Sequence, residues 1–485
     1  MTLPDQTERF TDGAVPFATG DATEVSVLFG VASSGAEATL MGPYLRTDDV
    51  LADFTSGVLV QAAAKELAEN KGLPIFLSRV RASAAGANSA VTQSGTGPAI
   101  TLTGTPVDDY PNAQIAILLG GARATATFKY TLDGVTWSQP IVTAATYALG
   151  ASGITAGFAV GTYVATETYS WASTAPYYST SDLGAAYVQA DTAGIPWKSG
   201  HVLGQVGGAA DSDKATAFGT LVAACKTLLA TSLAAHRIRS LLLEAPAVAD
   251  TLAGDTALAA VIDPLDCKQL NYAAGFCWMT SPVDGLSYKR SAAWPAFARM
   301  RGIGRKEDPK FVGRGPLCAQ TGALTAIEHD EYKREGLNGH RAITLRTYEG
   351  KGEKSFYITN YWQFAVPGSD YRYVQHWRVI SDCARLARAY MLDKIGSDTR
   401  TYPGAPNTPE GKVAGAILEE EALTIEGGVN DMLFREVTSK GDCQKVWIEI
   451  GRTNPILTDE MLKYRLRLRM PAYVGIIDAE FGFAI

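Results

Sequence analysis

The sequence lacks the motifs of the common metal and cofactor sites. Its 485 residues include six cysteines, with no C-x-x-C pair, and five histidines, with no H-E-x-x-H or H-x-H. This spacing excludes a disulfide scaffold and does not favour a zinc site, so we interpret the cysteines as reduced core residues. There is also no G-x-x-x-x-G-K-[ST] loop, complete G-x-G-x-x-G fingerprint or G-x-S-x-G elbow. We therefore expect no cofactor, no metal and no catalytic residue.

The chain also has no excess of positive charge. Forty-three basic residues stand against fifty acidic ones, giving a net charge of −7, and we identify no basic patch. Direct binding to nucleic acid is therefore not expected. The N-terminal sequence has no apolar core of a signal peptide, and apolar runs end well short of the roughly 20 residues of a membrane span. We expect a protein that is made in the cytoplasm and does not insert into membranes.

The patterns that are present indicate a mixed α/β chain of several domains. A strand is predicted at Val25–Val31, a helix at Val58–Asn70 and a strand at Leu73–Val80, followed by a small-residue linker at 82–98. From about residue 99 to 178 the apolar period changes to two, which predicts an inserted β-sandwich. Helix and strand signals return in 179–364, which we interpret as a middle α/β domain.

The C-terminal part predicts a long helix and apolar strands. The helix spans about Tyr373–Ile395, with an apolar stripe that includes Trp377 and Ile380 and an exposed polar line of Arg378, Asp382 and Arg385. Strands are predicted at 442–453 and 462–485. An apolar strand at a chain end normally frays, so we expect the last strand to pair with a sheet in this subunit or the next.

Three further motifs have simple structural interpretations. Asp133-Gly134 predicts a hairpin with a packed Trp137 rather than a sialidase-like repeat, because the motif occurs once. Asp108 and Asp109 point to opposite faces and predict a turn before Pro111, not a paired acid and base. The run Glu419–Glu421 is typical of a solvated helix face.

The order of these elements resembles that of contractile bacteriophage tail sheath proteins. The similarity lies in VSVLFGVASSG, in AKELAENKGLPIFLSRV, in the β insert from Thr103 to Pro140 and in the hairpin GLNGHRAITLRTYEGKGEKSFYITNYW. It covers most of the chain but contains no single invariant motif, and at Lys289–Arg301 this chain lacks a Pro-Pro-Ser-Gly segment found in many sheaths. The resemblance implies a discontinuous sheath core from 1–85 and 365–485, a middle α/β domain at 179–364 and an outer β-sandwich at 99–178.

The resemblance also implies a mechanical function without enzyme activity. Sheath subunits stack as hexameric rings around a tail tube and contract to drive the tube through the bacterial envelope. The implied partners are other copies of the chain, the tube protein, and baseplate and tail terminator proteins, and the implied location is the virion tail, assembled in the host cytoplasm. We expect Arg378, Asp382 and Arg385 to face the tube. Inter-subunit strands are expected at two sets of residues: Val25, Val27 and Phe29, and Val474, Ile476, Ile477, Phe481, Phe483 and Ile485.

Two alternatives remain open at this stage. A glycan-binding or carbohydrate-active virion protein would use the Trp137 hairpin with Tyr163, Tyr169 and Trp171. The second alternative is another self-assembling shell protein or a tail-tube protein, although a tube subunit is usually much shorter than this chain.

Overall fold

A computed structural model describes residues 25–204, 210–352, 354–366, 368–395, 397–403, 407–453 and 455–472. The described residues form two compact units. Unit 1 takes in those up to 303 and from 309 to 366, and unit 2 takes in those from 304 to 308 and from 368 onward.

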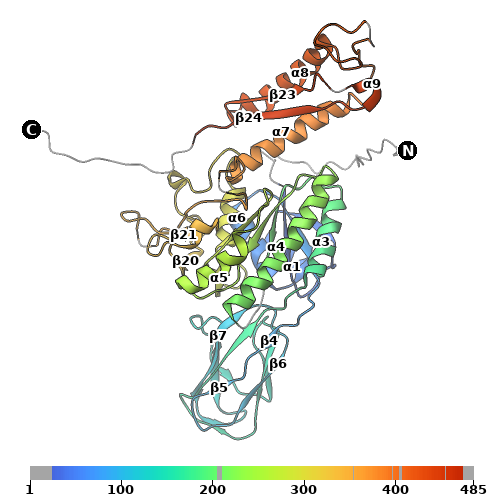
Figure 1. The fold of residues 1–485 in the computed structure, drawn as a ribbon. Coiled ribbons are helices and arrows are strands. Elements are labelled where there is room, and N and C mark those ends of the chain that lie inside the picture. The colour runs from blue at the N-terminus through green and yellow to red at the C-terminus, as the bar shows by residue number, and fades with distance from the viewer. Residues whose placement is uncertain are drawn as a thin grey trace, which may run out of the picture. The chain divides into compact units, whose positions relative to one another are not determined.

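Unit 1 is built on a six-stranded sheet in the order β17-β16-β15-β1-β3-β2 (Figure 1). All neighbouring strands are parallel except the edge strand β2, which is antiparallel to β3. The strands are β1 Ser26–Gly30, β2 Leu40–Tyr44, β3 Ile75–Arg79, β15 Ser199–Val202, β16 Ser240–Glu244 and β17 Leu270–Ala273.

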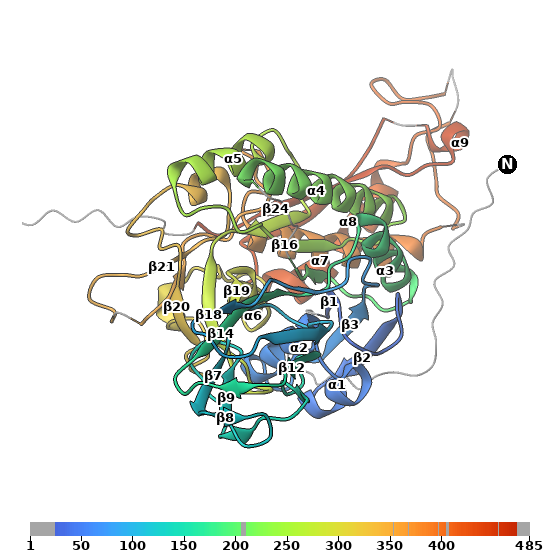
Figure 2. The same cartoon turned by 90° about the horizontal axis from the view of Figure 1, so that it is seen from below.

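Helices cover both faces of this sheet, as Figure 2 shows from below. Apolar residues of α3, α4 and α5 share one core with Val27 and Phe29 of β1, while α2 packs on β1 and β3, and α6 on β16 and β17. The helices are α1 Thr47–Phe54, α2 Val58–Glu69, α3 Thr180–Thr192, α4 Asp211–Ala234, α5 Leu252–Ile262 and α6 Ala293–Arg301. Parallel strands covered on both faces explain why β1 is a continuous apolar run.

The predicted inter-subunit role of the N-terminal strand is wrong. β1 pairs with β15 along one edge and with β3 along the other, so neither edge can accept or donate another strand. Val25, Val27 and Phe29 are buried in the core. The apolar run that suggested an exposed donor is the signature of a central strand instead.

Strands β4 to β14 are gathered in a part of unit 1 that contains no helix (Figure 1). Its main sheet has the order β10-β9-β7-β14-β4, with β5 also on β14, and a second sheet has the order β11-β12-β6. Side chains of both sheets, such as Phe128 and Phe158, share one core. The bounds are β4 Ala87–Asn88, β5 Thr92–Gln93, β6 Ile100–Gly104, β7 Tyr110–Leu119, β8 Gly121–Ala122, β9 Thr127–Thr131, β10 Ile141–Val142, β11 Thr146–Ala148, β12 Ile154–Phe158, β13 Thr162–Tyr163 and β14 Thr168–Thr174.

Two sequence-based interpretations of this part need correction. The predicted linker 82–98 contains β4 and β5, because strand pairing uses main-chain groups and does not require large side chains. Tyr163, Tyr169 and Trp171, assigned to a glycan surface, are buried in the core shared by the two sheets. The hairpin turn at Asp133 is confirmed, since Asp133 Oδ1 accepts hydrogen bonds from the main-chain N–H groups of Val135 and Thr136 at 2.8 and 2.7 Å.

The rest of unit 1 is a set of short strands. A three-stranded sheet has the order β19-β18-β20, and the expected hairpin within 336–362 is reduced to the two-residue strands β21 and β22. The bounds are β18 Phe276–Thr280, β19 Ser287–Ser291, β20 Leu324–Ile327, β21 Leu345–Arg346 and β22 Tyr357–Ile358.

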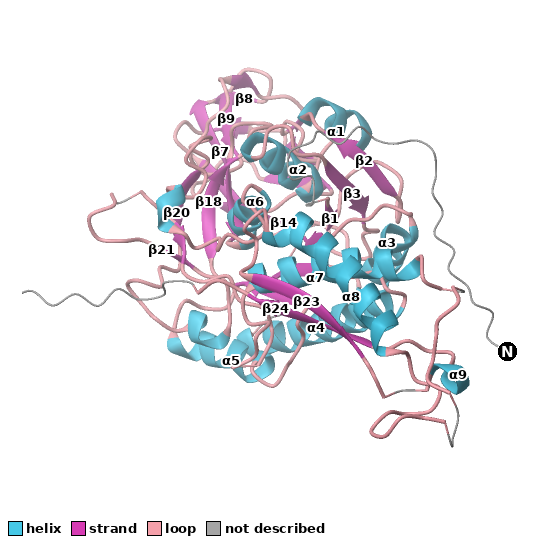
Figure 3. Cartoon of the chain, turned by 90° about the horizontal axis from the view of Figure 1, so that it is seen from above, coloured by secondary structure: helices cyan, strands magenta, loops and turns pink. Residues whose placement is uncertain are grey.

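Unit 2 consists of helices packed on one face of a two-stranded hairpin, visible in Figure 3. Its elements are α7 Val374–Leu392, α8 Glu419–Leu433, a π-helical end at Phe434–Thr438, β23 Lys445–Ile450, the short α9 Ile456–Asp459 and β24 Tyr464–Arg469. The buried stripe of α7 runs through Val379, Cys383 and Ala387, whereas Trp377 and Ile380 are only half-buried. Ala387 also belongs to the predicted stripe, which is therefore confirmed at this position but displaced around the helix at Trp377 and Ile380.

The predicted mixed α/β, multidomain class is confirmed, but the predicted grouping of segments differs from the structure. We expected 1–85 to form one core with 365–485, whereas β1, β2 and β3 share their sheet with β15, β16 and β17 from the 179–364 segment. Crossover connections decide which strands become neighbours, and the order of elements along the chain does not reveal them.

Contrary to expectation, one helix in the described part of the chain is long and apolar enough to cross a membrane. It is α4, Asp211–Ala234. Its side chains Phe218, Leu221, Val222, Cys225 and Leu229 are buried against the sheet, which is the behaviour of a core helix.

Candidate assembly site

The hairpin of β23 and β24 carries two different faces. In the register Lys445↔Arg469 to Ile450↔Tyr464, even-numbered side chains such as Ile448 and Leu466 pack on α7 and α8. Odd-numbered side chains lie on the opposite face, because successive side chains of a strand alternate. That face is exposed and basic, with Lys445, Arg465, Arg467 and Arg469.

This basic face was missed from the sequence. The alternation of arginine with Tyr464, Leu466 and Leu468 was visible, but the pairing that adds Lys445 opposite Arg469 was not. Glu449 is the acid on this face and lies 3.6 Å from Arg467. Like charges directly opposite each other in a sheet are destabilising, so an exposed face of this kind favours an acidic partner.

The two outer edges of the hairpin differ in their main-chain groups. Gly451 N–H donates to Lys463 O at 2.7 Å. Along an antiparallel pair, the residues whose main-chain groups point to the partner strand alternate with those whose groups point away. The main-chain N–H and C=O groups of odd-numbered residues therefore point to the partner strand, and those of even-numbered residues point to the outer edge. On β23, the outward N–H of Ile448 donates to Asn430 Oδ1 at 2.8 Å and that of Ile450 to Glu426 Oε1 at 2.6 Å. Side chains of α8 therefore close this edge.

Arg452 holds the closing carboxylate in place. Its guanidinium lies 2.9 Å from Glu426 Oε2 and 3.1 Å from Glu419 Oε1. The hydrogen bond from Arg452 lowers the pKa of Glu426 below its usual value. Glu419, predicted to lie on a solvated helix face, has a side chain that is 44% exposed and also takes part in this ion-pair network at the start of α8.

The edge of β24 is open among the described residues. The sheet has two strands there, and no hydrogen bond in the described part of the chain reaches the outward main-chain groups of Leu466 and Leu468. An open edge with an apolar face and a basic face is a template for an added strand. The predicted partner segment, Val474 to Ile485, lies outside the described residues.

The predicted polar line on α7 is mostly buried. Asp382 accepts hydrogen bonds from Arg305 and Arg385, each at 3.0 Å, and Arg378 donates to Gly304 O at 3.2 Å. Arg378 is 8% exposed and Asp382 is 5% exposed, while the Arg385 side chain is 26% exposed. The prediction of an exposed line is wrong for Arg378 and Asp382.

Arg305 explains this burial. Its Nε donates to Asp442 Oδ2 at 2.7 Å, and it also contacts Asp382 and Glu436 O, so one guanidinium joins α7 to the segment after α8. These partners are 77 and 137 residues from Arg305 in the sequence, and no spacing rule could have found them.

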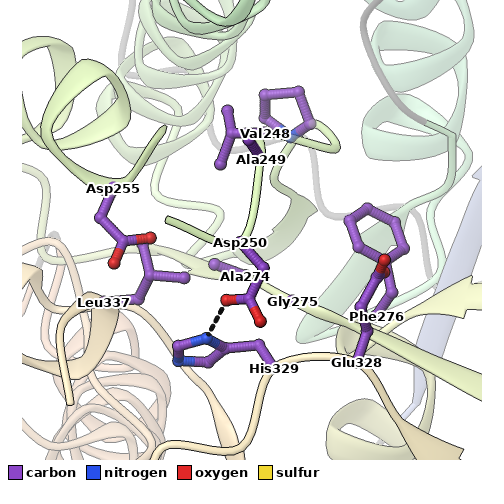
Figure 4. Close-up of a pocket in the computed structure, with 11 residues that line it drawn as sticks. Val248, Ala249, Asp250, Asp255, Ala274, Gly275, Phe276, Glu328, His329 and Leu337 are labelled. Carbon is purple, nitrogen blue, oxygen red and sulfur yellow. Dashed lines mark hydrogen bonds and ion pairs between the residues drawn. The ribbon is translucent and has the colours of Figure 1, made fainter. Parts of the chain in front are cut away.

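A second charged cluster surrounds a cavity of about 20 Å³ in unit 1, roughly the space of one water molecule (Figure 4). His329 points toward Asp250, with 2.8 Å between Nδ1 and Oδ1, and its Nε2 is 2.8 Å from Glu331 Oε2. Arg334 bridges Asp250 and Asp255. The cavity is too small for a substrate, and the cluster acts as a clamp between loops.

The charge state of His329 follows from its two partners. A neutral imidazole donates through one nitrogen only, whereas both nitrogens face carboxylates here. Burial alone would lower the pKa of His329, but its bonds to Glu331 and Asp250 outweigh burial and raise the pKa above the usual value. The two carboxylates therefore favour the imidazolium form of His329, although the Arg334 guanidinium also lies 3.0 Å from its Nδ1.

Comparison with known proteins places the fold. No protein-family model matches the sequence, and no curated protein matches it. A chain of the anti-feeding prophage (AFP) baseplate in contracted state matches with a TM-score of 0.52 at 12% identity, over 99% of this chain and 98% of that one. A chain of the 6-fold symmetrised AFP baseplate matches with a TM-score of 0.51 at 10% identity, over 100% of both chains.

A third solved structure is the sheath tail protein Lin1278 from Listeria innocua, with a TM-score of 0.46, 11% identity, and coverage of 92% of this chain and 95% of that one. The two AFP matches show that this chain shares, along its whole length, the fold of a chain of the AFP baseplate. They confirm, at the level of the fold, the resemblance to proteins of contractile particles.

Proposed function

We propose that this chain is a structural subunit of a contractile tail sheath. Copies polymerise as stacked hexameric rings around a tail tube, and contraction drives the tube through a bacterial envelope. The observation that carries the proposal is the open edge of β24 in a fold shared with AFP baseplate chains. The role is mechanical, with the tube, baseplate and tail terminator proteins as partners and the virion tail as location.

The C-terminal sequence complements the open edge. In residues 474–485, Ile477, Phe481, Phe483 and Ile485 share odd positions, and Asp478 and Glu480 share even positions. As a strand, this segment has one apolar face and a second face on which Val474 and Ile476 precede the two acids. Added beside β24 of another copy, it extends the apolar face of Leu466 and Leu468 and sets its acids on the basic face.

Strand donation from one copy to the next generates a polymer. Each copy accepts one strand and gives one, which is a head-to-tail contact, and such contacts build rings or open helices. Contraction is a switch between two packings of the same subunits, with stored free energy released past a kinetic barrier and no nucleotide required. Of the residues expected to face a tube, Arg385 has the most exposed side chain, and we propose tube contact for it alone.

Negative-stain electron microscopy of the purified chain at increasing concentration tests this proposal. The full chain should form hollow, striated tubes, and a chain ending at residue 472 should not. Reversing both acids (Asp478→Lys with Glu480→Lys) should also abolish tubes, and adding Arg465→Glu with Arg467→Glu should restore them. Normal tubes from the truncated chain would show that the C-terminal segment is not the connecting strand.

A further inference from the structure

A groove of about 390 Å³ lies in unit 1, separate from the hairpin of unit 2 and from the His329 cluster. Three segments form it: the beginning of α2 with the end of α1, the β-rich part between 107 and 152, and the turn at 283–288. Its walls include the aromatic side chains of Tyr110, Tyr130, Trp137 and Tyr288. This volume and lining are typical of a site for a small organic molecule.

The charges of the groove are unbalanced. Its lining contains two carboxylates, Asp108 and Asp284, and no lysine, arginine or histidine. Asp108 is neutralised by Arg290, with contacts of 2.7 and 2.6 Å. Asp284 lies at the surface and has no cation within ion-pair distance among the described residues.

Asp284 is nevertheless held firmly in place. Its Oδ2 accepts hydrogen bonds from the Tyr288 hydroxyl at 2.7 Å and from Gln61 Nε2 at 3.2 Å, and its Oδ1 accepts one from Leu286 N–H at 3.0 Å. Three donors from two segments fix the direction of this carboxylate. Pre-organised charge of this kind lowers the cost of binding a cation.

The aromatic wall adds a contact for the apolar body of a ligand. Trp137 is half-buried, and Lys129 Nζ already lies over its ring, 4.4 Å from the ring centre, so this ring offers the groove apolar surface. Tyr130 is half-buried beside it, and no hydrogen bond to its hydroxyl is found in the described part of the chain. A ring face, an available hydroxyl and a fixed carboxylate thus border one groove.

We propose that this groove binds a small organic cation of the alkylammonium class, with its ammonium group beside Asp284 and its apolar body against Tyr130 and Trp137. Charge complementarity selects the class, because the lining contains carboxylates and aromatic rings and no cationic residue, and the nearby cation, Lys129, is engaged on the Trp137 ring. A neutral sugar would use the rings but would gain nothing from the carboxylate. The site does not depend on polymer formation.

Isothermal titration of the full chain with 2-phenylethylammonium tests this site, with 2-phenylethanol as the uncharged probe. We expect one saturable site for the amine and binding at least tenfold weaker for the alcohol. Asp284→Asn should weaken amine binding at least tenfold, and Trp137→Leu should weaken it more than Trp137→Phe. Asp48→Asn, a change at a carboxylate that is 78% exposed and outside the groove, should leave binding unchanged.

The opposite results would overturn the proposal. Equal affinity for amine and alcohol, or an Asp284→Asn variant that binds normally, would remove the cation site. Near-ultraviolet circular dichroism confirms that each variant is folded, and Trp137→Phe keeps an aromatic ring if Trp137→Leu does not fold. If a lysine-containing peptide binds at least tenfold tighter than the free amine, the occupant of the groove is a protein side chain and not a small molecule.

Discussion

Asp108 and Arg290, 182 residues apart in the sequence, form a two-pronged ion pair with oxygen–nitrogen distances of 2.7 and 2.6 Å. Both side chains are almost fully buried. The pair joins the segment before β7 to β19, so it fixes the β-rich part of unit 1 to the rest of that unit. The sequence had suggested only a turn at this position.

Removing one partner of this pair should be costly. Asp108→Asn leaves a buried guanidinium without its counter-charge, and breaking such a pair typically costs about 3–5 kcal/mol. Urea unfolding of the variant should show that loss. Replacing both partners by apolar residues (Asp108→Leu with Arg290→Met) should cost less than the single change, and a double variant that is less stable than Asp108→Asn would contradict this account.

Asn430 should protect the hairpin from uncontrolled pairing. Asn430→Ala leaves the Ile448 N–H without its acceptor, at a cost of about 1–3 kcal/mol, and opens the edge of β23. We expect lower stability in urea and concentration-dependent self-association by light scattering. Asn430→Asp, which keeps an acceptor oxygen, serves as the matched control, and association of both variants to the same degree would argue against edge closure.

The His329 clamp should weaken in alkali. The pKa of His329 is higher in the folded than in the unfolded protein. Its contribution to the free energy of unfolding is therefore complete below the unfolded pKa of about 6.5 and is lost as the pH rises through the folded pKa. The pKa values of Asp250 and Glu331 are lowered in the folded protein. Their contributions to the free energy of unfolding are therefore present above about pH 4 and are lost as the pH falls through the folded-state pKa values.

Stability measured across pH tests this clamp. The difference in unfolding free energy between the wild type and His329→Gln should be about 3–5 kcal/mol near pH 6, and it should shrink as the pH rises above the raised pKa. His340→Gln is a suitable control, because His340 pairs with Asp263 at a more exposed position. A difference that is constant from pH 6 to pH 10 would mean that His329 is not the charged partner.

Charge reversal on α7 should distinguish a residue that contacts the tube from one that stabilises unit 2. Arg378→Glu places an acid at a buried position and should destabilise unit 2. Arg385→Glu alters a partly exposed side chain but removes its ion pair with Asp382, so it should destabilise unit 2 less than Arg378→Glu while it weakens attachment to the tube in a pull-down assay. Full attachment of a folded Arg385→Glu variant would exclude this residue from the tube contact.

Local patterns predicted local structure well. The apolar run at Val25–Val31, the helix at Val58–Asn70 and the Asp133-Gly134 turn all appear close to their expected bounds. These features depend on neighbouring residues, so a window of sequence contains them. The strand at Tyr464–Arg469 was also visible, because Tyr464, Leu466 and Leu468 alternate with arginine, but its pairing with β23 was not.

Long-range features could not be predicted in the same way. Whether β1 is a central or a donated strand depends on β15, more than 160 residues later, and both settings favour the same apolar run. The burial of Asp382 depends on Arg305, and closure of the β23 edge depends on Asn430. A charged residue looks exposed until its partner is known, which is why the α7 line was assigned to the surface.

The most direct test of the central claim is a cryo-electron microscopy reconstruction of the polymer formed by the purified chain. The account predicts a third strand along the open edge of β24, traced to residues 474–485 of a different copy, with Asp478 and Glu480 on the face of Arg465 and Arg467. A polymer in which the β24 edge is empty, or is filled by another segment, would contradict it.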